Sequence, residues 1–206
     1  MTPSAIVLCG GGSTRMGRDK GSLPFGDDTM LSRVIGIVGN VTNDIVVVAR
    51  DGQEIPAPHK GVPYRVRVVR DPVEGLGPLA GIVTGLRSIA SDVAFVTACD
   101  MPLLRPELVR RVLDLAGDHD VCVPVLDGHA MTMCGVYKKS VIAAAERLVA
   151  SGELSVKRLL DHVGVRRVDA ADLREVDPAL ESFFSCDTPE KYRQALETAL
   201  RTRRPS

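Results

Sequence analysis

Near its N-terminus the chain reads Leu8-Cys9-Gly10-Gly11-Gly12-Ser13-Thr14-Arg15-Met16-Gly17-Arg18-Asp19-Lys20, directly after the short apolar run Ala5-Ile6-Val7. The apolar run has the composition of a buried strand. Successive glycines after a strand allow backbone N–H groups to approach an anion without hindrance from Cβ atoms. Arg15 and Lys20 then supply cationic donors for phosphate oxygens. The stretch predicts a triphosphate-binding loop; a flexible glycine turn with solvated charges is the alternative.

The sequence motifs of two well-known phosphate-binding loops do not match this stretch. A P-loop requires G-x-x-x-x-G-K-[ST]; Gly12 and Gly17 have the spacing, but Arg18-Asp19 stands where Lys and Ser or Thr are needed. The dinucleotide fingerprint G-x-G-x-x-G fits Gly10 and Gly12 but meets Arg15 in place of its third glycine. An NADP-dependent reductase is therefore disfavoured.

Beyond the loop, strand-like and helix-like segments alternate along the chain. Strands are predicted at 45–48, 66–69, 93–98, 121–123, 131–137 and 165–168. Helices are predicted at 30–38, 77–86, 106–116, 138–150, 155–162 and 189–200. This alternation is typical of a parallel sheet covered on both faces. We predict a Rossmann-like α/β fold with a mostly parallel central sheet flanked by helices, in a single domain over residues 1–200, with a frayed basic tail at 201–206.

The composition excludes several classes of protein. The 206 residues are 45% hydrophobic and 25% charged, which is ordinary for a globular protein and excludes wholesale disorder. Lys and Arg balance Asp and Glu at 26 each and aromatic residues are scarce, so no nucleic-acid partner is expected. The 5 cysteines are far apart in the sequence, which suggests neither a zinc site nor a disulfide framework. Without a signal peptide or an apolar run of about 20 residues, we expect a cytoplasmic protein with no membrane association.

Two aspartates follow predicted strands. Asp100 comes after the strand 93–98, and Asp71 comes after the strand 66–69. Doubly wound α/β folds bind their ligands at the carboxyl ends of the strands. A carboxylate there can bind Mg²⁺, which prefers one or two carboxylates together with phosphate oxygens and water. The structural alternatives are a helix cap for Asp100 and an ordinary Asp-Pro turn for Asp71.

The string from Leu8 to Lys20 resembles the signature loop of the molybdenum cofactor guanylyltransferases, a family of the nucleotidyltransferase superfamily. Three further segments are similar to that family in the expected order: Asp71-Pro72, Gly77-Pro78-Leu79-Ala80-Gly81-Ile82 and Cys99-Asp100-Met101-Pro102. The ending Phe183-Phe184-Ser185-Cys186-Asp187-Thr188-Pro189-Glu190 resembles the family's closing motif, with Ser185 and Asp187 in place of two Asn residues. The resemblance spans almost the whole chain.

The resemblance implies transfer of GMP from GTP to the terminal phosphate of molybdopterin that carries molybdenum, with release of pyrophosphate and formation of molybdopterin guanine dinucleotide. The implied catalytic residues are Arg15, Lys20 and Asp100, and the implied Mg²⁺ ligands are Asp100 and Asp187. The implied nucleotide-binding residues are Leu8, Cys9, Gly10, Gly11, Gly12, Lys20, Asp71, Gly77, Pro78 and Asp100. Asp187 or Thr188 can alternatively cap the last helix. Enzymes or chaperones that accept the finished cofactor are the implied further partners.

The sequence does not determine which nucleotide base the protein selects. The family's Asn near the end of the second strand is missing, and Ala49-Arg50 stands there, so Arg50 is a candidate substitute. A cytidylyltransferase for the same pterin, a sugar-phosphate nucleotidyltransferase and a non-catalytic nucleotide-binding adaptor are the alternatives. The second substrate is expected at residues 125–160, where positive charge comes from Lys138, Lys139, Lys157 and Arg158. The histidines have no metal-ligand spacing and are expected at the surface.

Overall fold

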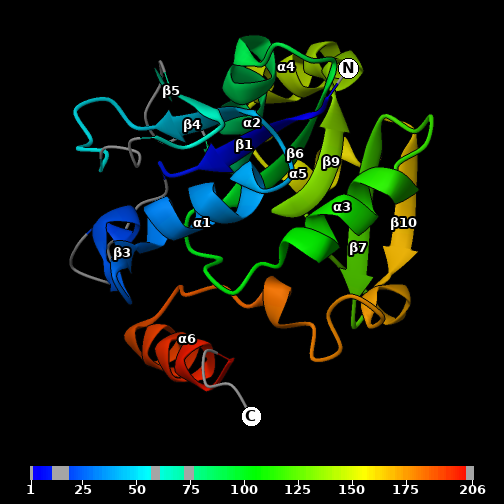
Figure 1. The fold of residues 1–206 in the computed structure, drawn as a ribbon. Helices are drawn as coiled ribbons and strands as arrows, with labels where there is room; N and C mark the ends of the chain where they lie inside the picture. The colour runs from blue at the N-terminus through cyan, green and yellow to red at the C-terminus, as the bar shows by residue number, and fades with distance from the viewer. Residues whose placement is uncertain (1, 11–18, 57–60, 72–76, 203–206) are drawn as a thin grey trace.

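The computed structural model describes residues 2–10, 19–56, 61–71 and 77–202. Its centre is a twisted sheet with the strand order β10-β7-β9-β6-β1-β4-β5, and the short β8 pairs with β7 (Figure 1). The strands are β1 (Ser4–Leu8), β4 (Asp44–Ala49), β5 (Arg65–Arg70), β6 (Val93–Ala98), β7 (Val121–Leu126), β8 (His129–Ala130), β9 (Cys134–Lys138) and β10 (Val165–Asp169). The predicted α/β fold with a mostly parallel sheet is confirmed.

Strand direction divides the sheet into two parallel parts. β5, β4, β1 and β6 are parallel to their neighbours, and so are β7 and β10. Between the two parts, β9 runs antiparallel to both β6 and β7. A turn and the short β8 connect β7 to β9 without a helix, and such a short connection can only join antiparallel strands. The strand predicted at 131–137 begins at Cys134, because residues 131–133 form the end of this connection.

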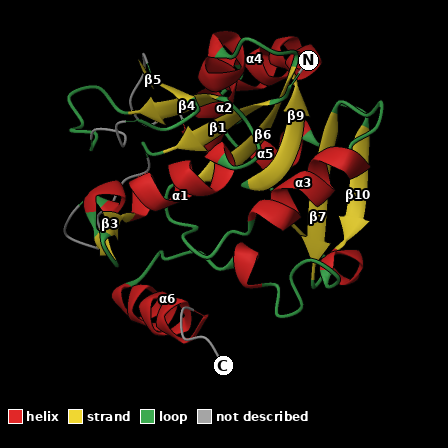
Figure 2. Ribbon diagram, in the orientation of Figure 1, coloured by secondary structure: helices red, strands yellow, loops and turns green. Residues whose placement is uncertain are grey.

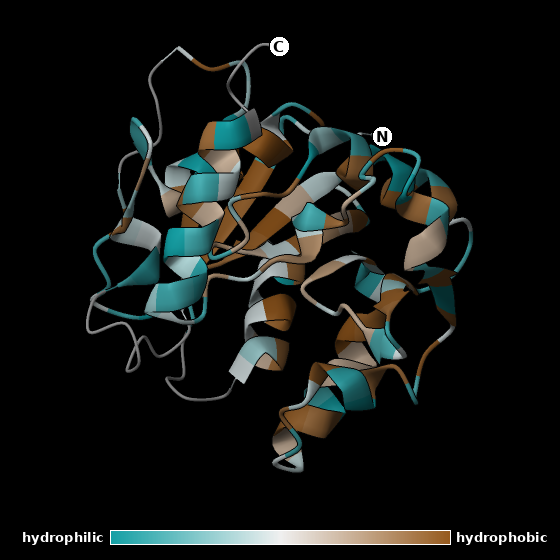
Figure 3. Cartoon of the chain, turned by 90° about the horizontal axis from the view of Figure 1, so that it is seen from below, coloured by the Kyte–Doolittle hydropathy of each residue, from teal (hydrophilic) through white to brown (hydrophobic). Residues whose placement is uncertain are grey.

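Helices cover both faces of the sheet (Figure 2). α1 (Met30–Gly39) and α3 (Pro106–Leu115) pack on one face, and α2 (Gly77–Ser88), α4 (Ile142–Ala150) and α5 (Val156–Leu159) pack on the other. The central strands are accordingly hydrophobic, as their brown colour in Figure 3 shows. α4 begins later than predicted because residues 139–141 form a 3-10 turn, and α5 is shorter than the helix predicted at 155–162.

A third, smaller layer was not predicted from the sequence. The hairpin of β2 (Pro24–Phe25) and β3 (Asp28–Thr29) lies between α1 and the last helix, α6 (Pro189–Thr202). Phe25 is buried there, with the Tyr192 ring of α6 edge-on at 6.5 Å and the Arg33 guanidinium of α1 over its face at 5.0 Å. α6 is thereby attached to the segment that follows the glycine loop. The helix includes Arg201 and Thr202, and residues 203–206 of the predicted frayed tail lie outside the described residues.

Helix ends follow local rules that the sequence signals. Thr29 caps α1 by accepting a hydrogen bond from Ser32 N, as its position before the apolar run predicts. Thr188 caps α6 by accepting a hydrogen bond from Lys191 N, which decides between the two capping candidates of the closing motif. None of the helices in the described ranges is long and apolar enough to cross a membrane.

Candidate active site

The ends of β1, β4 and β6 meet at one edge of the sheet, because the three strands are parallel neighbours. Cys9 N donates to Val48 O at 2.8 Å, and Cys99 N donates to Leu8 O at 3.0 Å. The chain segments beginning at Gly10, Arg50 and Asp100 therefore leave the sheet side by side. A Cβ atom on Gly10 would lie 3.2 Å from Arg50 Cγ, so the Arg50 side chain lies against the first glycine of the loop.

Lys20 and Asp100 form the contact at the centre of this edge. Lys20 begins a 3-10 turn, η1 (Lys20–Ser22), directly after the glycine loop, and its Nζ lies 2.9 Å from Asp100 Oδ2. The two side chains are only 20% and 15% exposed. The ion pair joins residues 80 positions apart in sequence. A cation and a carboxylate are thus held together at the carboxyl edge, where this class of fold binds ligands.

The closing motif reaches the same carboxylate. Ser185 Oγ donates to Asp100 Oδ2 at 3.1 Å, and Cys186 N donates to Asp100 O at 2.8 Å. The sequence gives no signal for this role of Ser185, which stands out there only as a departure from the family motif. The closing motif and Lys20 therefore hold the same carboxylate oxygen of Asp100.

A buried amide supports the end of the glycine loop. Gln53 is only 7% exposed, and its Nε2 donates to Cys9 O at 3.0 Å and to Asp19 Oδ2, while its Oε1 accepts from Arg50 N at 3.0 Å. Asp19 also caps η1 by accepting from Gly21 N, and it lies 3.8 Å from Arg50 Nη2. Gln53 lies in residues 51–63, a segment rich in Pro, Gly and charged residues that is typical of a surface loop, and no sequence pattern indicates the burial of this side chain.

Asp71 and the start of α2 lie at the same edge. Asp71 N donates to Ala49 O at 2.9 Å, which places Asp71 directly after the paired part of β5. A Cβ atom on Gly81 of α2 would lie 3.9 Å from Asp71 Oδ2 and 3.3 Å from Leu8 Cδ2. The structure thus brings the Asp71 carboxylate, the glycine side of α2 and the end of β1 together. The backbone of α2 approaches closely because Gly81 has no side chain.

Asp187 lies beside the start of α6 and carries a cationic partner of its own. Lys191 Nζ lies 2.8 Å from Asp187 Oδ1. The hydrogen bond from Lys191 lowers the pKa of Asp187 below its ordinary value, and the nearby charge of Lys20 acts in the same direction. Within the described ranges, no three His, Cys, Asp or Glu side chains form a metal-binding cluster. The assignment of Asp187 as a metal ligand stays a prediction.

A raised pKa keeps the thiols of Cys99 and Cys186, which lie near this edge, protonated. Cys9 and Cys99 follow β1 and β6, and both are buried. A hydrogen bond with Cys9, together with burial, raises the pKa of Cys99 well above its ordinary value. Burial also raises the pKa of Cys186 to about 12. The thiols of Cys99 and Cys186 are therefore neutral near pH 7, whereas the thiolate is the reactive form of cysteine.

Part of the predicted site lies outside the described residues. This holds for Gly11, Gly12 and Arg15, whose predicted contacts with phosphate stay predictions. Leu8, Cys9, Gly10, Lys20, Asp71, Gly77, Pro78 and Asp100 are described and lie at or next to the carboxyl edge of the sheet. The structure therefore brings these residues together at one edge, and their roles in binding and catalysis stay predictions.

The predicted location of two lysines is wrong. Lys138 pairs with Val93, the first residue of β6, so it lies at the amino edge of the sheet, opposite to Asp100. Its Nζ donates to Gly117 O at 3.1 Å, and Lys139 Nζ donates to Ile89 O at 3.0 Å. The antiparallel direction of β9 carries both lysines away from the carboxyl edge. They therefore do not lie where a second substrate could meet the nucleotide.

The other two cations predicted for the second substrate, Lys157 and Arg158, line a cavity of about 530 Å³. His129 lines the same cavity and is exposed, as predicted for the histidines. His119 and His162 are exposed as well, and His59 lies outside the described residues.

Comparison with known proteins identifies the family. The family model described as "MobA-like NTP transferase domain" matches residues 5–170, which include the glycine loop, Asp71 and Asp100. The chain belongs to this family. As a MobA-like NTP transferase domain, it shares the nucleotidyltransferase character that the geometry of the carboxyl edge indicates.

Individual relatives agree with this membership. The MobA-like chain is 32% identical over 205 residues to the "Molybdenum cofactor guanylyltransferase" of Desulfosudis oleivorans, covering 98% of each chain. It is 37% identical over 188 residues to a Mycobacterium marinum protein that carries the same name preceded by "Probable", covering 86% of this chain and 90% of the other. The crystal structure of molybdopterin-guanine dinucleotide biosynthesis protein A from Archaeoglobus fulgidus superposes with a TM-score of 0.80 at 25% identity, covering 96% of this chain and 99% of that chain.

Proposed function

We propose that the protein transfers GMP from GTP to the terminal phosphate of molybdopterin that carries molybdenum, forming molybdopterin guanine dinucleotide and pyrophosphate. The observation that carries the proposal is the 2.9 Å contact between Lys20 Nζ and Asp100 Oδ2. This contact holds a phosphate-binding cation and a metal-binding carboxylate within reach of one polyphosphate. Similarity to proteins named molybdenum cofactor guanylyltransferase over most of the chain supports the choice of substrates.

The chain's own groups bind and orient the reactants. Backbone N–H groups of residues 10–12, with Arg15 and Lys20, hold the β- and γ-phosphates of GTP. Asp71 and the close approach of α2 at Gly81 receive the nucleoside. An oxygen of the acceptor's terminal phosphate attacks the α-phosphorus in line, and the bond from that phosphorus to the pyrophosphate oxygen breaks. Such a transfer depends on positioning and charge neutralisation, so no side-chain nucleophile is needed.

The residues at Asp100 fit a Mg²⁺ ion. The carboxylate is partly exposed, and the hydrogen bonds from Lys20 and Ser185 both go to Oδ2, so lone pairs of the carboxylate remain for a metal. Mg²⁺ commonly takes one or two carboxylates together with phosphate oxygens and water. Asp100 would hold the ion, and Asp187 is the second candidate. Bound there, Mg²⁺ would neutralise charge on the α-phosphate and the phosphate next to it.

The other nucleotidyltransferases considered from the sequence use the same chemistry with different substrates. The names of the relatives favour guanylyl transfer to molybdopterin over cytidylyl transfer or a sugar phosphate. The five cysteines are free and buried, which supports a reducing cytoplasm as the compartment. In this scheme the finished cofactor passes to the enzymes or chaperones that accept it.

Mass spectrometry of the products formed from GTP, Mg²⁺ and molybdopterin tests the proposal. We expect molybdopterin guanine dinucleotide and pyrophosphate, and far less of both from Asp100→Asn under the same conditions. Isothermal titration with GTP, CTP and ATP in the presence of Mg²⁺ tests the base preference. Tight binding of CTP without binding of GTP would contradict the proposal.

A further inference from the structure

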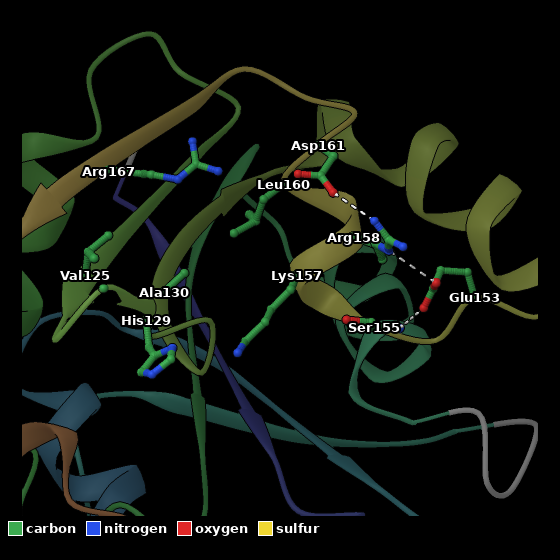
Figure 4. A pocket seen from close by; sticks show the side chains of 11 residues that line it. Val125, His129, Ala130, Glu153, Ser155, Lys157, Arg158, Leu160, Asp161 and Arg167 are labelled. Carbon is green, nitrogen blue, oxygen red and sulfur yellow. Dashed lines mark hydrogen bonds and ion pairs between the residues drawn. The ribbon is translucent and has the colours of Figure 1, made fainter.

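The cavity of about 530 Å³ lies outside the Lys20–Asp100 contact and has a composition of its own. It opens on the α2, α4 and α5 side of the sheet, at the carboxyl ends of β7 and β10 (Figure 4). Its volume falls within the range of small-molecule sites. Val125, Ala130 and Leu160 give it an apolar part, and three cations, Lys157, Arg158 and Arg167, line it as well.

The three cations differ in what they contact. Arg158 lies 3.7 Å from a carboxylate oxygen of Glu153 and 3.7 Å from one of Asp161, so its charge is neutralised within the cavity wall. Lys157 and Arg167 form no ion pair with any residue of the described ranges. Figure 4 shows Lys157 extending from α5 toward the hairpin that carries His129, while Arg167 extends from β10. Glu153 and Asp161 line the cavity as well, so its three cations exceed its two carboxylates by one charge. Lys157 and Arg167 are the lining cations that form no ion pair within the described ranges, and both are available to an anionic ligand.

The cavity touches the segment that the sequence assigns to the nucleotide. Leu154 lies between Glu153 and Ser155, which both line the cavity. A Cβ atom on Gly77, the first residue of α2, would lie 3.4 Å from Leu154 Cβ and 3.5 Å from Leu154 O. One short turn thus borders both the cavity and the start of α2.

The distance between the cavity and Asp100 is short enough for one extended molecule to reach both. β9 lies between β6, which Asp100 follows, and β7, which carries Val125. Neighbouring strands lie about 4.8 Å apart, so the two strands are roughly 10 Å apart. A group held in the cavity cannot be the phosphate that reacts at Asp100. An extended acceptor can place its phosphate at Asp100 and its other end in the cavity.

We propose that the cavity is the acceptor subsite, where Lys157 and Arg167 bind the anionic, ring-bearing end of molybdopterin remote from its reacting phosphate. The ring packs against Val125, Ala130 and Leu160, and the molybdenum-carrying group supplies the negative charge. This inference rests on the proposed function, because that function names the acceptor. It makes Lys157 and Arg167 determinants of acceptor affinity and leaves GTP affinity to the other parts of the carboxyl edge.

Direct binding measurements test the inference without requiring turnover. The dissociation constant of molybdopterin is measured by the change in pterin fluorescence for the full-length wild type, Lys157→Gln, Arg167→Gln and the double variant. Loss of one charge-assisted hydrogen bond corresponds to an increase of about tenfold in the dissociation constant, and the double variant should lose more. The dissociation constant of GTP, measured by titration calorimetry, should change by less than about twofold, which corresponds to about 0.4 kcal/mol of binding free energy.

Two matched control variants also remove one positive charge each, but at positions outside the cavity. Arg166→Gln removes the neighbouring charge of β10, whose side chain faces the opposite side of the sheet beside Cys122. Lys138→Gln removes a lysine at the amino edge. Both controls should bind molybdopterin like the wild type. A circular dichroism melt of each variant verifies that the fold is retained.

The outcomes separate this inference from the proposed function. If the wild type forms the dinucleotide but the double variant binds molybdopterin unchanged, the acceptor subsite is wrong and the function stands. If the variants lose molybdopterin affinity but the wild type transfers no GMP, the subsite stands and the function is wrong. Loss of GTP affinity to the same extent in the double variant, or no binding of molybdopterin by the wild type, overturns the subsite.

Discussion

Replacing Lys20 by Met tests whether the central contact serves catalysis more than stability. Among the side chains that the structure describes, the variant leaves Ser185 as the remaining hydrogen-bond donor to the Asp100 carboxylate, which is 15% exposed. Exposed ion pairs contribute about 0–1 kcal/mol, and breaking a buried pair costs about 3–5 kcal/mol. For a pair at this intermediate exposure we expect the free energy of unfolding to fall by about 1–2 kcal/mol.

The expected loss of activity is larger than the loss of stability. If Lys20 neutralises charge that develops as pyrophosphate leaves, its removal should lower kcat/KM for GTP about a hundredfold to a thousandfold, as for other preorganised donors. This corresponds to about 3–4 kcal/mol of transition-state stabilisation. The measurements are steady-state turnover with GTP and molybdopterin and urea unfolding followed by circular dichroism. Lys138→Met, at the opposite edge of the sheet, is the control and should leave kcat/KM unchanged.

A double-mutant cycle with Asp100→Asn distinguishes two roles for Lys20. If Lys20 contacts phosphate in addition to Asp100, the double variant will be slower than either single variant. Equal rates for the double variant and Asp100→Asn would mean that Lys20 acts only by positioning Asp100. The reasoning is refuted if Lys20→Met retains more than about a tenth of wild-type kcat/KM, because a loss that small is about 1.4 kcal/mol.

Three further predictions concern stability. Burial would raise the pKa of Asp44, but hydrogen bonds from Ser4, Ala90 N and Arg67 hold this pKa below 3.8. The ionised carboxylate therefore stabilises the fold above about pH 4, and this stabilisation is lost as the pH falls through the lowered native pKa. Asp44→Asn should therefore be less stable at pH 7 and show a weaker loss of stability between pH 5 and about pH 2 in urea titrations. Gly135→Ala would place a Cβ atom 2.8 Å from Cys122 O and 2.8 Å from Val123 Cγ1, and should lower the free energy of unfolding by about 1–3 kcal/mol. Gly36→Ala in α1, whose Cβ atom would meet only Tyr64 Oη at 4.0 Å, should instead raise it by about 0.5–1 kcal/mol; a loss there would contradict the packing argument.

The sequence predicted the elements whose signals are local. Buried strands such as Ile45–Val48 show up as continuous β-branched runs, and α1 begins where Thr29 precedes an apolar periodic segment. The glycine loop and the aspartates after strands pointed to a polyphosphate site because each occupies a recognisable position in an α/β pattern. These features depend on residues within a few positions of one another, so the chain carries them independently of its tertiary structure.

What the sequence did not predict depends on contacts between distant segments. The burial of Gln53 and the role of Ser185 each arise from segments that meet only in the folded chain. The hairpin of residues 24–29 is too short to show a strand period, and its burial comes from α6. The placement of Lys138 was wrong because nothing in its own strand reveals that β9 runs antiparallel to β6.

The amino-acid sequence by itself determined the α/β fold and indicated a phosphate-binding glycine loop, because apolar periodicity and glycine spacing are properties of contiguous residues. Its resemblance to the molybdenum cofactor guanylyltransferases implied the nucleotidyl transfer. Only the tertiary structure decided which charges act together, since strand order and direction set which ends share an edge. The pairing of Lys20 with Asp100 and the separate cavity at Lys157 and Arg167 follow from that order. Pairings between strands far apart in the chain are selected by the packing of the whole core, which no single segment encodes.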